Sequence, residues 1–258
     1  MKNKYNNHEN IIVGRNSVNE ALRSNRPIDH ILISRGTNSG SILTIVAKAK
    51  SMGIPIKECN PKKLDYMCAS AAHQGIIAVA AAYRYSELED IFNLADSRNE
   101  PPFIIIADEI EDPHNLGAII RSAECAGAHG IIIPKRRSSG LTYVVSKASA
   151  GALEYVPIVK VTNISATIDD LKTQGVWIYG ADMKGTTWCQ TDLNGPVALV
   201  IGNEGHGISR LVKEKCDVIL SLPMKGNITS LNASVAAGIL MYEISRQRSN
   251  IKSFSDRR

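Results

Sequence analysis

The second part of the chain, from Phe103 onward, contains six short apolar runs, each separated from the next by a helical or loop segment. The runs are FIIIAD, GIIIP, YVPIVKV, VWIYGAD, PVALVIGN and VILSLP. Continuous apolar runs of this length are typical of strands that are buried on both faces. Strands that alternate with helices pair in parallel, and the helices cover both faces of the sheet. This region therefore predicts an α/β domain with a mostly parallel sheet.

A smaller α/β unit is expected before this region, between residues 11 and 85. There the apolar runs HILIS and IPIKEC flank the helical stretch SILTIVAKAKSMG, and GIIAVAAAY follows. These runs are short enough for strands, and the stretch between them is long enough for a helix. The unit is therefore predicted to bury a core of its own.

The boundary between the two regions is expected in YSELEDIFNLADSRNEPP, an acidic and polar segment that ends in two prolines. Such a composition suits a domain boundary that contains a short helix. We expect one domain at residues 10–85, a linker at 86–100 and a second domain at 101–250.

Charge and cysteine content narrow the functional classes. The formal net charge is +5, which weakly favours an anionic partner such as a nucleic acid. The five cysteines are scattered without CxxC spacing, as in a protein of a reducing compartment. No apolar run approaches the roughly 20 residues that span a bilayer, and the polar start lacks the apolar region of a signal peptide. We expect a cytoplasmic protein that does not bind membranes.

Three loops stand out, because ligands of open parallel sheets bind beyond the carboxyl ends of the strands. The first, DEIEDPHNLGAIIRSAECAGAHG, leads into a helix that carries Asn115 and Arg121. Asn115 either caps this helix or faces a ligand, and Arg121 either forms a surface salt bridge or faces a ligand. Cys125 lies in the apolar part of the helix, so we expect it to be buried and inert.

The same loop is rich in carboxylates, which are ligands that hard metal ions prefer. Its spacing matches no ligand pattern, and acidic residues are also favourable near a helix N-terminus. We therefore predict no metal site. The candidate ligands considered are Asp108, Glu109, Glu111, Asp112 and His114.

The second loop is VIGNEGHGIS, and the third is LPMKGNITSLNASVAAGI. The second is rich in glycine but matches no phosphate-binding motif, and a plain glycine turn does not explain Glu204. In the third loop Ser230 is a candidate helix cap, and small residues allow close packing. Packing does not require Ser230 and Asn232 together beside a glycine turn.

The chain is expected to end in an amphipathic helix from about Ser230 to Arg248. Apolar residues recur there at roughly helical spacing, at Leu231, Val235, Ile239, Leu240 and Ile244.

Taken together, the three loops resemble the three motifs of the SpoU-type branch of the SPOUT methyltransferases. The matching segments are NLGAIIRSAECAG, LVIGNEGHGIS and LPMKGNITSLNASVAAGILMYE, in that order. IIVGRNSVNEAL and AHQGIIAV look like the small L30e-like substrate-binding domain that precedes the catalytic domain in 23S rRNA guanosine-2′-O-methyltransferases. SKASAGALEYVPI fits the family's segment between the first two motifs.

The resemblance implies a fold and a cofactor. The expected fold is a C-terminal parallel-sheet SPOUT domain with a deep trefoil knot, plus a small N-terminal L30e-like α/β domain. The expected cofactor is S-adenosyl-L-methionine, and the expected assembly is a homodimer through the knotted domain. Carried over by motif position, the cofactor contacts are Gly202, Leu222, Leu231 and Ala181.

The implied activity is methyl transfer to a ribose 2′-OH of RNA, with a guanosine of 23S rRNA as the expected target. The alternatives are a tRNA 2′-O-methyltransferase and a non-catalytic RNA-binding protein of the same fold. By motif position, the residues around the reacting centre are Arg121, Asn115, Glu204, Ser230 and Asn232.

Arg121 is expected to act as an electrostatic clamp on a phosphate or on the developing alkoxide, because a guanidinium stays charged and is a poor base. Glu204 is expected to orient Arg121 or Asn115. RNA binding is expected at Lys135, Arg136 and Arg137 in PKRRSSG and on the small domain. The alternative for PKRRSSG is an ordinary solvated basic loop.

Overall fold

The computed structural model describes residues 11–36, 40–68, 72–81 and 83–251. Residue 10, the expected start of the first domain, lies outside these ranges. The chain forms two compact units, and each contains two stretches of sequence. The small unit comprises residues up to Arg84 together with Gly140–Tyr155, and the larger unit comprises Tyr85–Ser139 together with Val156–Arg258.

The small unit is built on a mixed four-stranded sheet in the order β1-β4-β2-β3. Strand β4 pairs antiparallel with β1 and β2, whereas β2 and β3 are parallel. Helices α1 and α2 pack on one face and α3 on the other, each over its own apolar cluster. The bounds are β1 Ile11–Val13, α1 Arg15–Arg23, β2 Ile28–Ser34, α2 Gly40–Ser51, β3 Ile56–Cys59, α3 Pro61–Met67 and β4 Ile76–Ala80.

The segment Gly140–Tyr155 belongs to the small unit, although it follows the first two strands of the larger sheet. It contains α6 (Tyr143–Ala148) and the short 3-10 helix η2 (Ala152–Glu154). A buried ion pair of 3.0 Å joins Arg26 to Glu154, and the Arg26 guanidinium lies 3.5 Å from the ring centre of Tyr83. The small unit therefore includes a segment that we expected within the continuous domain at 101–250.

The expected linker at 86–100 contains the short helix that the sequence predicts, α4 (Leu88–Arg98). The helix begins with a capping box between Glu87 and Asp90. Its Ile91 is fully buried in the core of the larger unit. The segment is therefore a packed part of that unit.

The larger unit has a six-stranded sheet in the order β10-β8-β9-β5-β6-β7, and every pair in it is parallel. Each of the six apolar runs forms one of these strands, as the sequence predicts. The strands are β5 Phe103–Ala107, β6 Gly130–Pro134, β7 Ile158–Val161, β8 Trp177–Thr187, β9 Val197–Ile201 and β10 Val218–Ser221. The helices that complete the unit are α5 Pro113–Cys125, α7 Ile164–Thr173, η3 Trp188–Gln190, α8 Arg210–Glu214 and α9 Ala233–Arg248.

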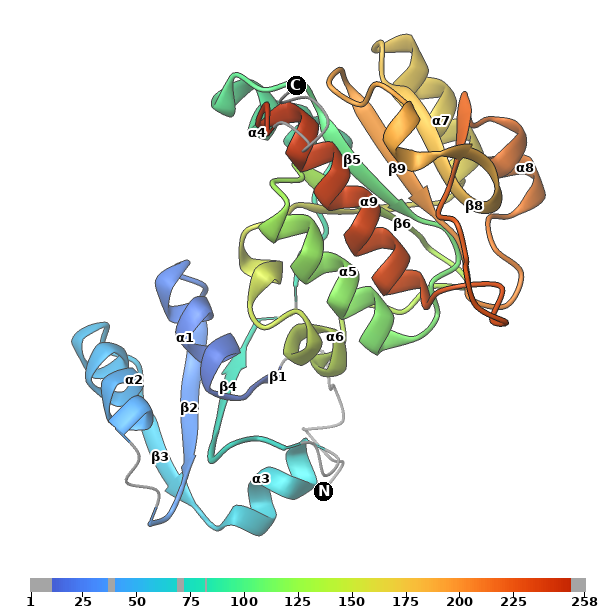
Figure 1. The fold of residues 1–258 in the computed structure, drawn as a ribbon. Coiled ribbons are helices and arrows are strands. Elements are labelled where there is room, and N and C mark those ends of the chain that lie inside the picture. The colour runs from blue at the N-terminus through green and yellow to red at the C-terminus, as the bar shows by residue number, and fades with distance from the viewer. Residues whose placement is uncertain (1–10, 37–39, 69–71, 82, 252–258) are drawn as a thin grey trace. The chain divides into compact units, whose positions relative to one another are not determined.

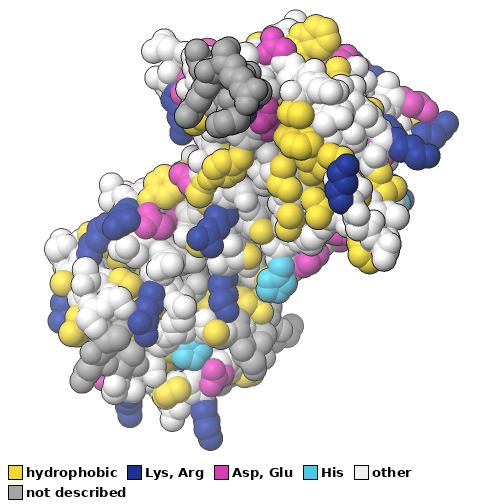
Figure 2. All heavy atoms as spheres, in the orientation of Figure 1, with side chains coloured by type: hydrophobic (Ala, Val, Ile, Leu, Met, Phe, Trp, Pro, Cys, Tyr) yellow, Lys and Arg dark blue, Asp and Glu magenta, His cyan; other side chains and the backbone are white. Residues whose placement is uncertain are grey.

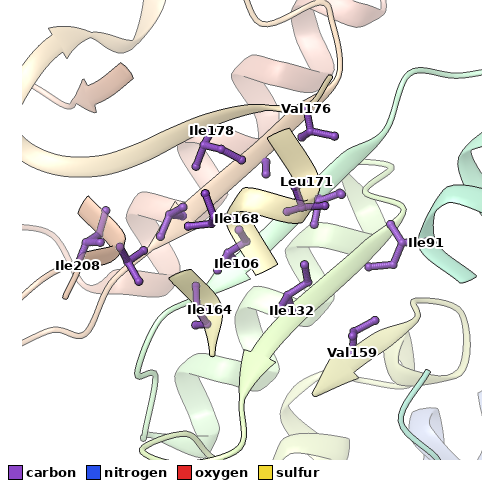
Figure 3. Close-up of a cluster of buried hydrophobic side chains, with 14 residues drawn as sticks. Ile91, Ile106, Ile132, Val159, Ile164, Ile168, Leu171, Val176, Ile178 and Ile208 are labelled. Carbon is purple, nitrogen blue, oxygen red and sulfur yellow. The ribbon is translucent and has the colours of Figure 1, made fainter. Parts of the chain in front are cut away.

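Helices cover both faces of this sheet. Side chains of α4, α7 and α8 form one apolar cluster with the strands, and Figure 3 shows Ile164, Ile168 and Leu171 of α7 within it. Helices α5 and α9 lie side by side across the other face (Figure 1). The unit is thus a three-layer parallel α/β domain, while the trefoil knot stays a prediction. Among the residues that the structure describes, no helix is long and apolar enough to cross a bilayer.

The last helix differs from the predicted one in where it begins and which face it buries. It starts at Ala233 because Asn232, not Ser230, accepts hydrogen bonds from the first free backbone N–H groups. Val235 and Ile239, expected on the buried stripe, are 50% and 41% exposed. Leu240 and Ile244 are buried as expected, and Ala233, Ala237 and Met241 complete the buried stripe.

Candidate functional site

A cavity of about 350 Å³ lies at the carboxyl ends of β8, β9 and β10 and against the start of α9. This is the edge at which parallel sheets bind their ligands. All four residues predicted to contact the cofactor line the cavity. They are Ala181, Gly202, Leu222 and Leu231. Two of the residues predicted at the reacting centre, Glu204 and Ser230, line it as well.

The loop after β9 turns so tightly that only glycine fits at Gly202. A Cβ atom built there would lie 2.2 Å from the backbone of both Gly207 and Ile208. The loop is closed by two backbone hydrogen bonds between Asn203 and Gly207, of 3.1 and 2.9 Å. The Asn203 side chain accepts a bond from Gly205 N at 2.8 Å and donates one to the Glu109 carbonyl at 2.9 Å. The loop backbone is thereby fixed against the cavity.

Outside the Gly202 loop, the cavity wall contains apolar side chains and the Asp182 carboxylate. Leu220, Leu222 and Leu240 contribute apolar surface. Partial burial opposes ionisation of Asp182, but the Lys213 ammonium at 2.6 Å and nearby backbone N–H groups lower the pKa of that carboxyl. The Asp182 carboxyl is therefore ionised at neutral pH and paired with Lys213.

A hydrogen-bond network beside the cavity joins the three motifs. Asn115 Nδ2 donates to Glu204 Oε1, while Asn115 Oδ1 accepts from Asn232 Nδ2 at 2.9 Å and from Ser234 Oγ at 3.2 Å. Only 8% of Asn115 is exposed, so both ends of its amide are held by protein groups. The structure therefore brings together residues from three segments more than 20 positions apart.

Asn115 does not cap its helix, so that alternative is wrong. Asp112 caps α5 by accepting a bond from His114 N at 2.9 Å, which places Asn115 inside the first turn. Ser230 likewise does not cap α9, because the cap is Asn232. In both helices the capping residue lies at a different position from the candidate, and Asn115 is left to bond across to the other motifs.

Arg121 is not part of this network. It lies six residues after Asn115, about 1.7 turns along α5, so the two side chains leave the helix on different faces. Arg121 is exposed, and among the described residues it has no hydrogen bond or ion pair, so the expected surface salt bridge is not formed. Its guanidinium is available to a molecule outside this chain.

Cys125 is exposed at the end of α5, so the expectation that it is buried is wrong. The helix ends at this residue, and the buried side of its last turn is occupied by Ala123. Partial burial and the neighbouring Glu124 carboxylate raise the pKa of the Cys125 thiol. The thiol is thus held in its protonated, weakly nucleophilic form.

The basic loop after β6 is linked to the cavity through Glu109. The Glu109 carboxylate pairs with Arg137 at 3.0 Å and with His206, which lines the cavity, at 2.9 Å. Burial opposes ionisation of Glu109, but these bonds prevail and lower its pKa. Lys135 and Arg136 are exposed and have no side-chain partner within the described ranges.

Two residues of the site, Asn203 and Ser234, were not predicted from the sequence, and neither was the bridging role of Glu109. Asn203 precedes Glu204 in a glycine-rich loop. An Asn in such a loop often accepts a hydrogen bond from the backbone N–H two residues further along the chain. Ser234 follows Asn232 by two positions, so both residues lie at the start of the same helix. Nothing in the sequence indicates that Glu109 faces both His206 and Arg137.

The acidic loop contains no metal site in the described part of the chain. Asp108 is buried and accepts a bond from Ser209 N at 2.7 Å, and Asp112 caps α5. These carboxylates are therefore engaged in local structure.

Fold and site together define an α/β protein that holds a small ligand at the carboxyl edge of a parallel sheet and carries a second α/β unit. The SpoU rRNA Methylase family matches residues 102–242, and the family described as RNA 2′-O ribose methyltransferase substrate binding matches residues 11–86. The chain belongs to the SpoU rRNA methylase family.

Similar proteins match over both units. YacO of Bacillus subtilis (strain 168), named as a TrmH family tRNA/rRNA methyltransferase, is 48% identical over 93% of this chain and 96% of its own. The SpoU methyltransferase AviRb of Streptomyces viridochromogenes, solved with AdoMet, has a TM-score of 0.78 at 26% identity and covers 93% of this chain and 90% of its own. An AdoMet-bound rRNA methyltransferase of Sinorhizobium meliloti has a TM-score of 0.75 at 25% identity, over 94% and 88%.

The chain is an S-adenosylmethionine-dependent RNA 2′-O-methyltransferase. The residues of the cavity fit this cofactor. Gly202, Gly205 and Gly207 line the cavity with backbone alone, and leucine side chains provide an apolar wall for a flat ring.

Proposed function

We propose that this enzyme methylates the ribose 2′-OH of a guanosine in 23S rRNA. The family is described for rRNA, and the Sinorhizobium meliloti protein named as an rRNA methyltransferase matches both units. The alternative substrate is a tRNA, because the name of the Bacillus subtilis relative includes both tRNA and rRNA. The test described below distinguishes the two.

The observation that carries the proposal is the Asn115 network at the edge of the cavity. It fixes Asn115 between Glu204 and Asn232, so the three motifs present their polar groups at one place. When bound, S-adenosylmethionine supplies an electrophilic sulfonium methyl group. Gly202, Leu222, Leu231 and Ala181 would hold the cofactor through their backbone and apolar surface.

The chain's own groups would place the ribose and stabilise its oxygen. Glu204 orients Asn115 rather than Arg121, since its carboxylate accepts the Asn115 amide. Arg121, exposed and permanently charged, would clamp a phosphate or the developing alkoxide. Ser230, which lines the cavity, would donate or accept a hydrogen bond at the substrate.

We further propose that the larger unit forms a homodimer through α9. Val235, Ile239 and Tyr242 are 50%, 41% and 55% exposed and lie three to four residues apart, on one side of the helix. Figure 2 shows an apolar patch over the middle of α9. A contiguous exposed apolar surface of this kind is typical of a protein interface. Light scattering would show a dimer for the native chain and a monomer for Ile239→Glu.

The test of the activity is a map of 2′-O-methylation on total RNA from a strain that lacks this gene and from its parent. The proposal predicts the loss of one methylated guanosine in 23S rRNA, restored by the native gene and not by Arg121→Ala. A lost methyl group in tRNA, with rRNA unchanged, would establish the tRNA alternative.

A further inference from the structure

A second cavity, of about 130 Å³, lies in the small unit between the sheet and α3. It is lined by His30, Leu32, Lys63, Tyr66 and Met67. Leu32 and Met67 are buried and form an apolar floor, whereas Tyr66 is 72% exposed. An apolar floor beside an open aromatic ring can accept one flat ring.

The rim of this cavity is basic. Lys57 pairs in register with Leu32 on the neighbouring strand, so its side chain leaves the sheet on the face of α3. Lys62 and Lys63 are exposed on α3. Within the described residues, none of these three lysines forms an ion pair with a carboxylate. They are therefore available to an anionic partner.

In the described part of the chain, the nearby carboxylates form no ion pair with these lysines. Glu58 follows Lys57 along β3 and so projects from the opposite face of the sheet. The Asp65 carboxylate contacts His73, with 3.2 Å between Asp65 Oδ1 and His73 Nε2. Dark blue side chains project from the lower end of the small unit in Figure 2, where Figure 1 places α3.

The imidazole of His30 favours its neutral form, because partial burial and the positive charge of Lys57 lower its pKa. A neutral imidazole can lie against a nucleobase and exchange hydrogen bonds with its edge. The cavity thus combines two rings, an apolar floor and a cationic rim.

We propose that this surface binds an unpaired nucleotide of the RNA substrate, with its base in the cavity against Tyr66 and its phosphates on Lys57, Lys62 and Lys63. Bases of a double helix are stacked inside it, whereas an unpaired base can be turned out onto an aromatic side chain. The inference rests on the RNA substrate of the proposed function, but not on which RNA or nucleotide is methylated.

The first test measures binding of the full-length protein to a short labelled single strand of mixed sequence and to a hairpin duplex of the same composition. Tyr66→Leu keeps an apolar side chain but removes the ring, so we expect about 10-fold weaker binding of the single strand. Tyr66→Phe keeps the ring and should bind within about twofold of the native chain. Equal binding of the single strand by Tyr66→Leu and the native protein would overturn the proposal.

The second test distinguishes the contribution of the basic rim to RNA binding from the contribution of the protein's overall positive charge. Lys63→Ala should weaken single-strand binding about threefold and reduce the slope of log affinity against log salt by about 0.7. Lys50→Ala removes an exposed lysine from α2, on the opposite face of the sheet, and serves as the matched control with an expected change below about twofold. Equal losses for both variants would mean that the surface carries no defined site.

Photocrosslinking to a strand that contains bromouridine gives a readout on the native protein, without any substitution. The proposal predicts crosslinked peptides that contain Tyr66 or His30. Crosslinks confined to other segments would contradict it, as would a native protein that prefers the duplex. An acidic protein partner, the rival occupant, would leave Tyr66 uncrosslinked and single-strand binding unchanged in Tyr66→Leu.

These results are independent of the proposed target. If the deletion strain loses a 23S rRNA methyl group but Tyr66→Leu binds RNA normally, the target stands and this inference fails. If no rRNA or tRNA methyl group is lost but Tyr66 carries RNA binding, the inference stands and the target fails.

Discussion

The cavities of the two units are built from different parts of the chain. In the larger unit, loops after three parallel strands form the wall, and the tight loop at Gly202 leaves no room for a side chain. In the small unit, the wall consists of side chains on a strand and a helix, and Tyr66 stands open to solvent. Backbone held by hydrogen bonds fixes atoms to within a narrow range, as methyl transfer requires. Exposed side chains can adapt to an RNA of variable shape.

Polar groups follow the same division. In the larger unit, Asn115 has both ends of its amide bonded to other motifs. In the small unit, the ammonium groups of Lys57 and Lys63 have no ion-pair partner among the residues described. A bonded network excludes alternative geometries, whereas unpaired cations attract any polyanion. We infer that the larger unit tolerates substitutions less well than the small unit. Single substitutions should therefore change cofactor binding or turnover strongly in the larger unit and RNA binding only moderately in the small unit.

Gly202→Ala should have the largest effect. The added methyl group would meet backbone atoms at 2.2 Å, and because the loop is closed on itself it can make room only by opening. We expect affinity for S-adenosylmethionine to fall by more than about 100-fold, measured by titration calorimetry. Gly195→Ala, which meets no atom within 4 Å, should bind normally. Retained binding in Gly202→Ala would break the contrast between a rigid and an adaptable cavity.

Arg121→Lys should come next. The charge is kept but the planar fork of donors is lost, so we expect turnover to fall about 50-fold while the dissociation constant for RNA changes less than about threefold. Single-turnover kinetics with the RNA identified by the methylation map would measure the rate of methyl transfer separately from the dissociation constant for RNA. Arg210→Lys, in an exposed pair with Glu214, is the control and should be unaffected. Unchanged turnover in Arg121→Lys would contradict the clamp.

Asn115→Asp tests the network that joins the motifs. The substitution removes the donor to Glu204 and sets two carboxylates against each other, while an acidic residue in the first turn of α5 remains compatible with the helix. We expect turnover about 20-fold lower, together with a loss of about 1–3 kcal/mol of stability, because the buried side chain at position 115 loses its hydrogen bond to Glu204. The double variant Asn115→Asp, Glu204→Gln restores one donor and one acceptor and should recover part of the activity. A double variant as impaired as the product of the single losses would show that the pair does not act together.

The smallest effects are expected in the basic loop of the larger unit. Arg136→Ala should weaken RNA binding about threefold at every RNA sequence, as removal of one phosphate contact does. Arg137→Ala should match that loss and also weaken cofactor binding about twofold, since Arg137 holds Glu109 and thereby His206 of the cavity loop. Identical cofactor affinity in both variants would mean that the loop is separate from the cavity.

The parallel sheet could be predicted because each of its strands is apolar on both faces, and short runs rich in β-branched residues, such as FIIIAD and GIIIP, favour buried strands over helices. The cofactor residues were predictable only through the family motifs. No periodicity distinguishes Leu222 or Leu231 from core leucines, yet both line the cavity. The hydrogen bond between Asn115 and Glu204 could be predicted only in part, because the sequence offered Arg121 as an equally good partner for Glu204.

Other features could not be predicted because they depend on contacts between distant segments. Gly140–Tyr155 packs as part of the small unit, where the buried ion pair between Arg26 and Glu154 joins residues 128 positions apart. The exposed side of α9 was misjudged because small and large apolar residues occur on both sides of that helix. Only the position of α5 and the sheet decides that Leu240 is covered and Ile239 is not.

By itself, the sequence determined the order and type of the elements in the larger unit and the motifs that identify the family. These depend on local composition and spacing, which the chain carries at every stage of folding. The tertiary structure alone decided which motif side chains bond to one another, which helix face stays open, and where aromatic and basic groups meet beside His30. Such contacts exist only once segments far apart in sequence are packed together, because hydrogen bonds and burial act over a few ångströms.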